Sequence, residues 1–255
     1  LDRHPSPTHN TAMHTKNNLK HSLALAAIGG LSLAGSAQAA LLAVDFQHTT
    51  TGFAGETQSG FQAFTNDGSG SASETRTFGV YDVTISGHEF TLIEGFFNRT
   101  DLDNGGSLTT ADLYEDFVFD NDPGGSESMS LSISGTGISP DTAYRMTLYS
   151  FDPLASMGTH TVSFNGASGT TGSAANIVWD GAVNPTTDGQ YATTGTFTSD
   201  GTGVLTIDLD DSWTGATESS GIRLNAFELD VIPEPSAAAL LGLGGLGLIL
   251  RRRRK

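Results

Sequence analysis

The stretch SMSLSIS, residues 128–134, is decisive for the fold because it alternates strictly between apolar and hydroxyl side chains. Met129, Leu131 and Ile133 fall on one side of an extended chain, and the four serines fall on the other. A period of two residues indicates a β-strand with one buried and one solvated face. The stretch therefore predicts an antiparallel sheet, since such sheets commonly cover a core with one face only.

Segments of similar character surround this stretch and recur roughly every 10–20 residues, with Gly, Asn, Asp, Ser or Pro between them. The expected strands are 41–46, two strands within 77–93 joined at Ser86-Gly87, 128–134, 144–152, 160–164, 175–179, 191–199, 203–209 and 221–231. The segment at 110–119 is the best candidate for a helical turn, and it can equally enter a strand. The pattern predicts an all-β fold: one antiparallel β-sandwich of jelly-roll type over residues 40–231.

The predicted sandwich is strongly acidic and has no cysteine. The whole chain of 255 residues carries a formal charge of −16, but residues 40–232 contain 26 Asp and Glu against four Arg and no Lys. Such a surface repels nucleic acid and anionic lipid, so we expect no nucleic-acid partner. The lack of cysteine excludes disulfides and thiol chemistry.

Residues 13–39 have the three-part layout of a secretory signal peptide. Two lysines precede an apolar run of about 11 residues, which is too short to span a bilayer, and small residues follow. Ala37 and Ala39 occupy the A-x-A positions, so signal peptidase is expected to cut before Ala40. The preceding residues 1–12 show no pattern and are interpreted as an upstream or disordered extension.

The last segment of the sequence, residues 232–255, combines a rigid motif, an apolar run and a block of cations. Fourteen uncharged residues at 237–250 predict a short transmembrane helix, and the cations after it favour the cytoplasmic side. The rigid motif is Pro233, Glu234 and Pro235, and the cations include Arg251, Arg252, Arg253 and Arg254.

This segment resembles the PEP-CTERM sorting signal of exported bacterial proteins. The resemblance implies that an exosortase recognises Pro233, Glu234 and Pro235, and that the arginine cluster retains the chain in the inner membrane until it is cut. It also implies delivery to the cell envelope, the cell surface or the extracellular matrix. The alternative is a plain membrane anchor that is never processed.

The body shows a second resemblance, to galactose-binding-like and other carbohydrate-binding sandwiches of exported bacterial proteins. It rests on LLAVDFQ and GFQAF near the start, DLYEDFVF, SGTGISPDTAYRMTLYSFD and the closing IRLNAFELDV. The resemblance implies that the last strand pairs near the first, and that residues 137–142 form the turn before a central strand. It concerns the fold more than the activity.

The segment DLDNGGSLTTAD, residues 101–112, has the spacing of a calcium-binding loop and resembles a dockerin loop. An acidic, glycine-rich hairpin loop would have much the same composition, so both interpretations stay open. Carboxylates at two strand ends, 116–122 and 208–211, are further candidates for Ca²⁺ between strands. The predicted ligands of the loop are Asp101, Asp103, Gly105, Ser107, Thr109 and Asp112.

Three aromatic residues are candidates for stacking on sugar rings: Trp179, Tyr191 and Trp213. They lie at the ends of expected strands or in loops, and Trp213 is flanked by acids that can accept hydrogen bonds from sugar hydroxyls. The alternative is that these rings pack in the core or at its rim.

These observations predict an exported, non-catalytic β-sandwich that binds glycan or exopolysaccharide, with Ca²⁺ as a possible cofactor. Motifs of serine hydrolases, zinc proteases and P-loop enzymes are absent from the sequence. A first alternative is a secreted glycan hydrolase or lyase, which needs a pair of carboxylates across the sugar. A second alternative is an inert structural component of the surface or biofilm matrix.

Overall fold

The structure, a computed structural model, describes residues 40–47, 57–65, 73–87, 96–98, 108–120, 128–153, 158–181, 183–215 and 221–232. The chain divides into two compact units, Leu1–Ala39 and Ala40–Lys255, and every described residue belongs to the second unit. The predicted signal peptide and the Pro-Glu-Pro tail lie outside the described residues. Within the described part of the chain, no helix is long and apolar enough to cross a membrane.

The described residues form β-strands with one short 3₁₀ helix. The elements are β1 (Leu42–Gln47), β2 (Gln62–Thr65), β3 (Ser73–Phe78), β4 (Tyr81–Gly87), β5 (Phe96–Asn98), η1 (Asp112–Tyr114), β6 (Asp116–Asp120), β7 (Ser128–Ser134), β8 (Ala143–Tyr149), β9 (Gly158–Gly166), β10 (Thr171–Trp179), β11 (Ala192–Thr198), β12 (Leu205–Gly215), β13 (Ile222–Leu224) and β14 (Ala226–Val231). The prediction of an all-β fold is confirmed.

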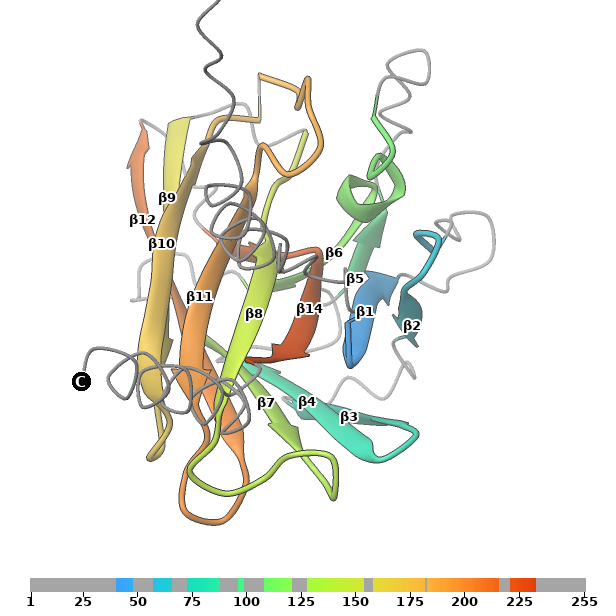
Figure 1. Ribbon diagram of the computed structural model, residues 1–255. Coiled ribbons are helices and arrows are strands. Elements are labelled where there is room, and N and C mark those ends of the chain that lie inside the picture. Colours follow the sequence, from blue (N-terminus) through green and yellow to red (C-terminus); the bar gives the residue numbers. More distant parts are fainter. Residues whose placement is uncertain are drawn as a thin grey trace, which may run out of the picture. The chain divides into compact units, whose positions relative to one another are not determined.

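The strands form a large sheet and a small one (Figure 1). The large sheet has eleven strands in the order β2-β1-β14-β8-β11-β10-β9-β12-β7-β4-β3, and the small sheet has the order β13-β6-β5. β1 and β2 run parallel, and the other described pairs are antiparallel. β1 of the large sheet also contacts β5 and β6, so the two sheets meet there.

The alternation in the sequence translates directly into the core. In β7, Met129, Leu131 and Ile133 are at most 1% exposed, whereas the serines between them are accessible. The neighbouring β12 buries every second residue in the same way. Burying each such side chain contributes about 1.5–3 kcal/mol, so this inward face is the main source of stability.

The hairpin of β3 and β4 corrects one prediction. The sequence predicted a strand through residues 77–85 before a turn at Ser86-Gly87, but Phe78 pairs with Tyr81, so the chain already turns at Gly79-Val80. The second predicted strand, up to residue 93, lies outside the described residues. Gly79 has φ +63°, which suits the first central position of a two-residue hairpin turn. Ser86 and Gly87 instead lie in β4, where the chain pairs with β7.

Asn225 divides the predicted strand 221–231 into two. β13 before it pairs with β6 of the small sheet, and β14 after it pairs with β1 and β8 of the large sheet. The pairing of β14 with β1 confirms that the last strand returns to the first. The predicted turn at 137–142 precedes β8, which lies between β14 and β11.

The segment at 110–119 contains both structures that the sequence allowed, η1 and then β6. β2, β3 and β5 were not predicted as strands. β2 and β5 have only four and three residues, and β3 lies in a polar segment with no alternating apolar residues.

Candidate functional site

An unbroken row of polar residues crosses the outer face of the large sheet; we call it the polar row. Each member is paired in register with the next, and none of them is buried. Paired residues on neighbouring strands point to the same face of a sheet. The polar row consists, in spatial order from β3 to β14, of Ser73, Ser86, Ser130, Asp208, Asn165, Ser173, Thr196, Arg145 and Asp230.

Hydroxyl groups continue on both sides of the polar row. Thr75 and Thr84 are paired on β3 and β4, with their hydroxyl oxygens 2.8 Å apart. On β11 and β8 the hydroxyls of Thr194 and Thr147 lie 3.1 Å apart. These groups hold one another in fixed positions, so the face presents an ordered array of donors and acceptors.

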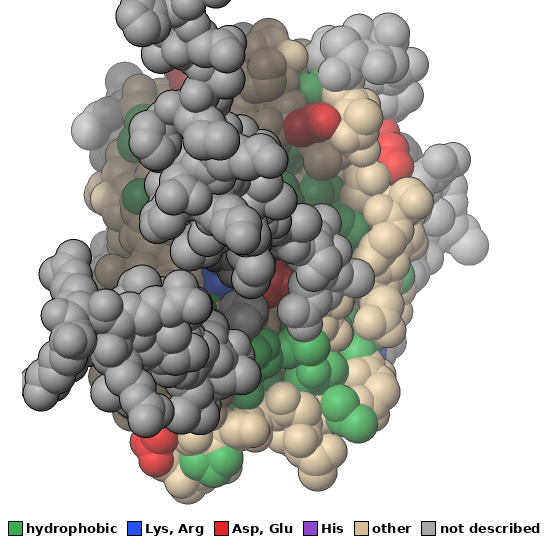
Figure 2. All heavy atoms as spheres, viewed as in Figure 1, with side chains coloured by type: hydrophobic (Ala, Val, Ile, Leu, Met, Phe, Trp, Pro, Cys, Tyr) green, Lys and Arg blue, Asp and Glu red, His purple; other side chains and the backbone are tan. Residues whose placement is uncertain are grey.

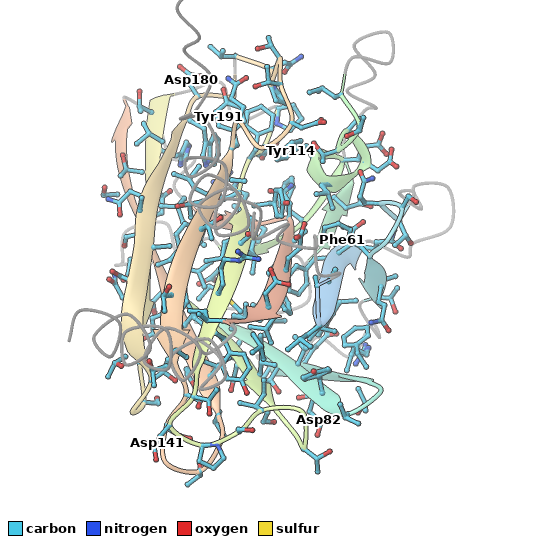
Figure 3. The ribbon with its side chains drawn as sticks, in the orientation of Figure 1. Phe61, Asp82, Tyr114, Asp141, Asp180 and Tyr191 are labelled. Atoms are coloured by element: carbon cyan, nitrogen blue, oxygen red, sulfur yellow. The ribbon has the colours of Figure 1, made fainter. Side chains whose placement is uncertain are left out.

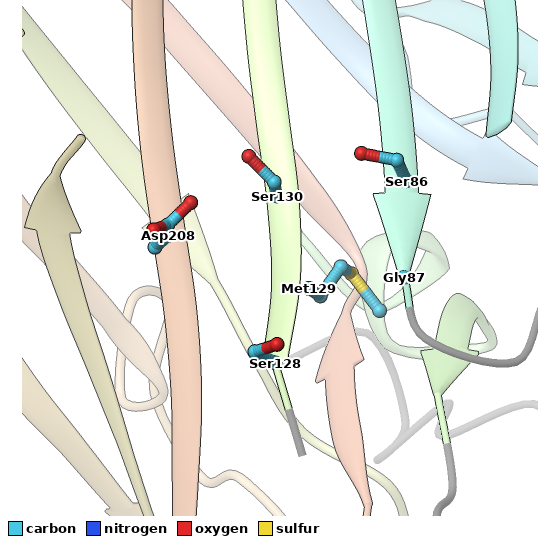
Figure 4. A pocket seen from close by; sticks show the side chains of 6 residues that line it. All are labelled: Ser86, Gly87, Ser128, Met129, Ser130 and Asp208. Atoms are coloured by element: carbon cyan, nitrogen blue, oxygen red, sulfur yellow. The ribbon is translucent and has the colours of Figure 1, made fainter. Parts of the chain in front are cut away.

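The sheet is hollowed over one part of the polar row. This hollow has a volume of about 260 Å³ and is lined by β4, β7 and β12. Figure 4 shows Ser86, Ser130 and Asp208 at nearly the same level on three neighbouring strands, with Met129 beside them. The lining residues are Ser86, Gly87, Ser128, Met129, Ser130 and Asp208.

Two carboxylates of β12 face the same side as the hollow. Asp208 is paired with Ser130, and Asp210 is paired with Ser128. Partial burial and the negative charge of Asp208 raise the pKa of Asp210 above its ordinary value. Hydroxyls and carboxylates together can accept and donate hydrogen bonds to a polyol, and this chemistry matches the hydroxyl groups of a neutral sugar.

The surface outside the core is mostly neutral and polar. On the face shown in Figure 2, tan atoms of neutral polar side chains and backbone predominate among the described residues, and acids appear as separate spots. The exposed large apolar side chains of the described residues are valines and one isoleucine, without an aromatic ring: Val80, Val178, Val183, Val231 and Ile232.

The structure corrects the stacking prediction for Trp179. Its side chain is only 2% exposed, and its ring stacks on His160 with the ring centres 4.2 Å apart. The guanidinium of Arg223 lies 5.6 Å from the ring centre, and Phe151 contacts the ring edge-on. A ring enclosed by these neighbours packs the core and is closed to a sugar.

Tyr191 is also enclosed. It is 5% exposed and stacks on Phe151 with parallel rings 4.5 Å apart, while its hydroxyl donates to the Val183 carbonyl. Figure 3 shows Tyr191 and Tyr114 close together at the same end of the domain, and their ring centres are 6.5 Å apart. The core interpretation therefore holds for Trp179 and Tyr191, and the side chain of Trp213 lies outside the described residues.

The predicted calcium loop is described only in part. Asp101, Asp103, Gly105 and Ser107 lie outside the described residues. Thr109 is exposed, and its amide and hydroxyl both donate to Asp188. Asp112 begins η1 and lies near Asp45, whose pKa its charge helps to raise. Thr109 and Asp112 are thus oriented toward different parts of the chain.

The carboxylates at 208–211 do not form one group. Asp208 and Asp210 lie on the outer face, whereas Asp211 faces the core, where its Oδ2 is hydrogen-bonded to Nδ1 of His160 at 2.7 Å. At the other predicted strand end, Asp116 and Asp120 are buried at opposite ends of β6. Across the described residues, no three His, Cys, Asp or Glu side chains gather as a metal centre.

Sequence reasoning missed the polar row because its members come from nine strands that are far apart in the chain. The alternating Ser, Thr and Asp residues of each strand were visible, but the register between strands was not. Of the predicted sorting residues, Ala40 begins the described part of the chain; Ala37, Ala39, Pro233, Glu234, Pro235 and Arg251–Arg254 lie outside it.

Comparison with solved structures finds a limited likeness to the P-domain of Macrobrachium rosenbergii nodavirus. The identity is 15%, the match covers 45% of this chain and 87% of that chain, and the TM-score is 0.28, which is too low to support an argument. No curated protein matches the sequence.

A family described as the PEP-CTERM protein-sorting motif matches residues 231–254. The match covers the Pro-Glu-Pro motif, the apolar run and the arginine cluster, and thus confirms the resemblance seen in the sequence. The chain therefore carries a PEP-CTERM sorting motif, which supports its identification as an exported protein that an exosortase processes at the membrane.

Proposed function

We propose that the body of this exported protein is a non-catalytic module that binds a neutral glycan or exopolysaccharide through the polar row and its hollow. The observation that carries this proposal is the continuity of the row over nine strands, from Ser73 to Asp230. At about 4.8 Å between strands the row follows roughly 40 Å of sheet, which suits a polymer better than a single sugar.

The mode of binding follows from the side chains present. Each hydrogen bond to a sugar hydroxyl contributes only about 0.5–1.5 kcal/mol net, so affinity depends on many contacts along the chain of the polymer. The aromatic rings of the described residues are buried or only partly accessible, so the proposed binding relies on hydrogen bonds more than on stacking. The expected binding is weak for a short oligosaccharide and stronger for a long one.

The enzymatic alternative has less support. A hydrolase or lyase needs two carboxylates that reach the sugar. The two carboxylates with the most strongly raised pKa values are Asp45, at about 7, and Asp116, at about 8, mainly because burial disfavours their charged forms. They are 0% and 1% exposed, so a polymer at the surface does not reach them.

Isothermal titration with neutral polysaccharides and their oligosaccharides tests the proposal. Ser130→Val and Asp208→Asn should each weaken binding by about five- to ten-fold, because the first removes a hydroxyl group from the hollow and the second replaces a charged acceptor with a weaker neutral amide. Thr194→Val is the matched control, since Thr194 lies on the same face outside the polar row. Absence of heat with all polysaccharides tested, or equal affinity of all variants, would contradict the proposal.

Calcium assistance at the loop 101–112 remains a prediction. Repeating the titration in CaCl₂ with Asp103→Asn tests it, because this variant should bind glycan as weakly as the wild type does in EDTA only if a cation in the loop assists binding.

A further inference from the structure

A second polar group lies inside the protein, where the large and small sheets meet; we call it the buried acidic cluster. It consists of Asp45 on β1, Asp116 at the start of β6 and Gln58 in the segment before β2. Their exposed fractions are 0%, 1% and 7%. It is separate from the polar row, which lies on the outer face.

Four oxygen atoms of the buried acidic cluster find no hydrogen-bond donor among the described residues: Oδ1 of Asp45, Oε1 of Gln58 and both carboxylate oxygens of Asp116. Buried polar atoms in native proteins are nearly always paired, so four unpaired acceptors in one group require an explanation. All four are hard oxygen atoms, and no described arginine side chain forms a salt bridge with them.

One hydrogen bond joins Gln58 to Asp45, and the packing of β1 against β6 brings Asp116 near Asp45. The backbone amide of Gln58 donates to Oδ2 of Asp45 at 2.9 Å. Asp45 is paired in register with Ala226, and the neighbouring Asn225 donates from its side chain to the Asp116 carbonyl at 2.8 Å. The side-chain amide of Gln58 donates to the Thr109 carbonyl, which fixes the orientation of the Gln58 side chain.

The negative charge of this cluster has no described counter-charge. The arginines of the described residues pair with other acids: Arg76 with Glu74, Arg145 with Asp230 and Arg223 with Asp152. Only like charges act on the two carboxylates, from Asp112 on Asp45, and from Asp45 and Glu115 on Asp116. Burial without a counter-charge disfavours the charged form of a carboxyl group, and a bound cation would favour that form instead.

We propose that Asp45, Asp116 and Gln58 bind a Ca²⁺ ion that joins β1, β6 and the segment before β2. Calcium takes six to eight oxygen ligands in flexible geometry, including carboxylates, amide oxygens and water. Two carboxylates and one amide supply part of this set, and water completes it. Magnesium requires stricter octahedral geometry, and zinc prefers nitrogen and sulfur ligands, which this cluster lacks.

The ion stabilises the junction between the sheets. Because it binds the folded state only, calcium raises the free energy of unfolding by mass action. This role concerns the stability of the domain and is independent of glycan binding on the outer face.

Titration of the full chain, first stripped of metal with EDTA, tests the inference. Calorimetry with CaCl₂ should show a binding site that depends on Asp45 and Asp116, and a hundred-fold excess over its Kd should raise Tm by about 5 °C or more. MgCl₂ should bind more weakly. Asp45→Asn and Asp116→Asn should each weaken calcium binding at least about ten-fold, since each removes a charged ligand.

Two variants serve as controls, Asp141→Asn at an exposed turn and Asp103→Asn in the predicted calcium loop. Both should retain the affinity of the wild type. The asparagine variants at Asp45 and Asp116 keep the side-chain shape and remove a buried charge, so we expect them to fold without metal; circular dichroism checks this. Absence of calcium binding by the wild type would overturn the inference, as would loss of binding in Asp103→Asn alone.

Discussion

His160 illustrates how one residue can join several parts of the core. Its ring stacks on Trp179, and its Nδ1 lies 2.7 Å from Oδ2 of Asp211. Both the histidine and the aspartate side chains are at most 1% exposed. His160 thus has two structural roles, since it packs against an aromatic ring and provides a hydrogen-bond partner for a buried carboxylate.

Substituting this histidine should therefore be costly. His160→Ala removes a packed ring and leaves Asp211 without its partner, and we expect a loss of about 3 kcal/mol or more in the free energy of unfolding. Urea denaturation followed by circular dichroism measures this loss.

The double variant His160→Phe/Asp211→Leu separates the two roles. It retains a ring against Trp179 and removes the buried carboxylate, so it should recover a large part of the lost stability. A double variant as unstable as His160→Ala would show that the polar pair itself, and not only its packing, is required.

Asp188 provides a pH-dependent contact at the surface. Its carboxylate accepts hydrogen bonds from the amides and hydroxyls of Thr109 and Thr110, and these bonds hold its pKa below the ordinary value of 3.8. A lowered pKa in the folded state means that the carboxylate stabilises the fold above pH 3.8, and that this contribution is lost as the pH falls through the folded-state pKa.

Asp188→Asn should accordingly produce a small decrease in Tm near neutral pH, and the difference from the wild type should shrink as the pH falls below 3.8 and through the lower folded-state pKa. Thermal melts monitored by circular dichroism between about pH 2 and pH 7 measure this. If the difference in Tm stays constant over this pH range, the charge of Asp188 contributes nothing to its contact with Thr109 and Thr110.

At the scale of elements, Asn225 connects the two sheets. Its backbone bonds to Phe46 and Tyr149, its side-chain oxygen accepts from the Phe151 amide at 2.7 Å, and its side-chain nitrogen donates to the Asp116 carbonyl. The residue is fully buried, so no water replaces these bonds.

Asn225→Ala should lower the free energy of unfolding by about 2–4 kcal/mol, because it leaves a buried amide and a buried carbonyl without partners. Asn165→Ala is the matched control: Asn165 is exposed on the outer face, and its loss should change stability by no more than about 0.5 kcal/mol. Equal effects of the two substitutions in urea denaturation would argue against a connecting role for Asn225.

The elements also show what the sequence can predict. Alternation identified β7 with its correct bounds, because burial of every second residue is encoded locally. The turn at Gly79-Val80 was missed, because Gly79 lies within a run of strand-forming residues and only the pairing of β3 with β4 shows that the chain reverses there.

The candidate site was less predictable than the elements. A polar row across nine strands depends on the register of eight pairings, and no single segment encodes that register. Trp179 was expected to be available to a ligand, but its strand places it opposite His160 on the buried face. The sequence did not identify Asp45 as a candidate site residue, because its surroundings form only when β1 packs against β6.

At the scale of the whole molecule, the body and the sorting motif supply different information. The motif at 231–254 supports export and processing at the membrane, but it does not specify what the body binds. The body has an acidic, cysteine-free composition and an outer face rich in hydroxyl groups. Our proposal for glycan binding therefore rests on that outer face.

The most direct test of this claim is an NMR titration of the protein with an oligosaccharide that binds in calorimetry. The chemical shifts of the backbone amides are mapped along the chain. The account predicts that the largest shifts occur in β4, β7 and β12 around Ser86, Ser130 and Asp208, and extend along the polar row with longer oligosaccharides. Shifts confined to other parts of the chain, or no shifts with an oligosaccharide that binds in calorimetry, would contradict it.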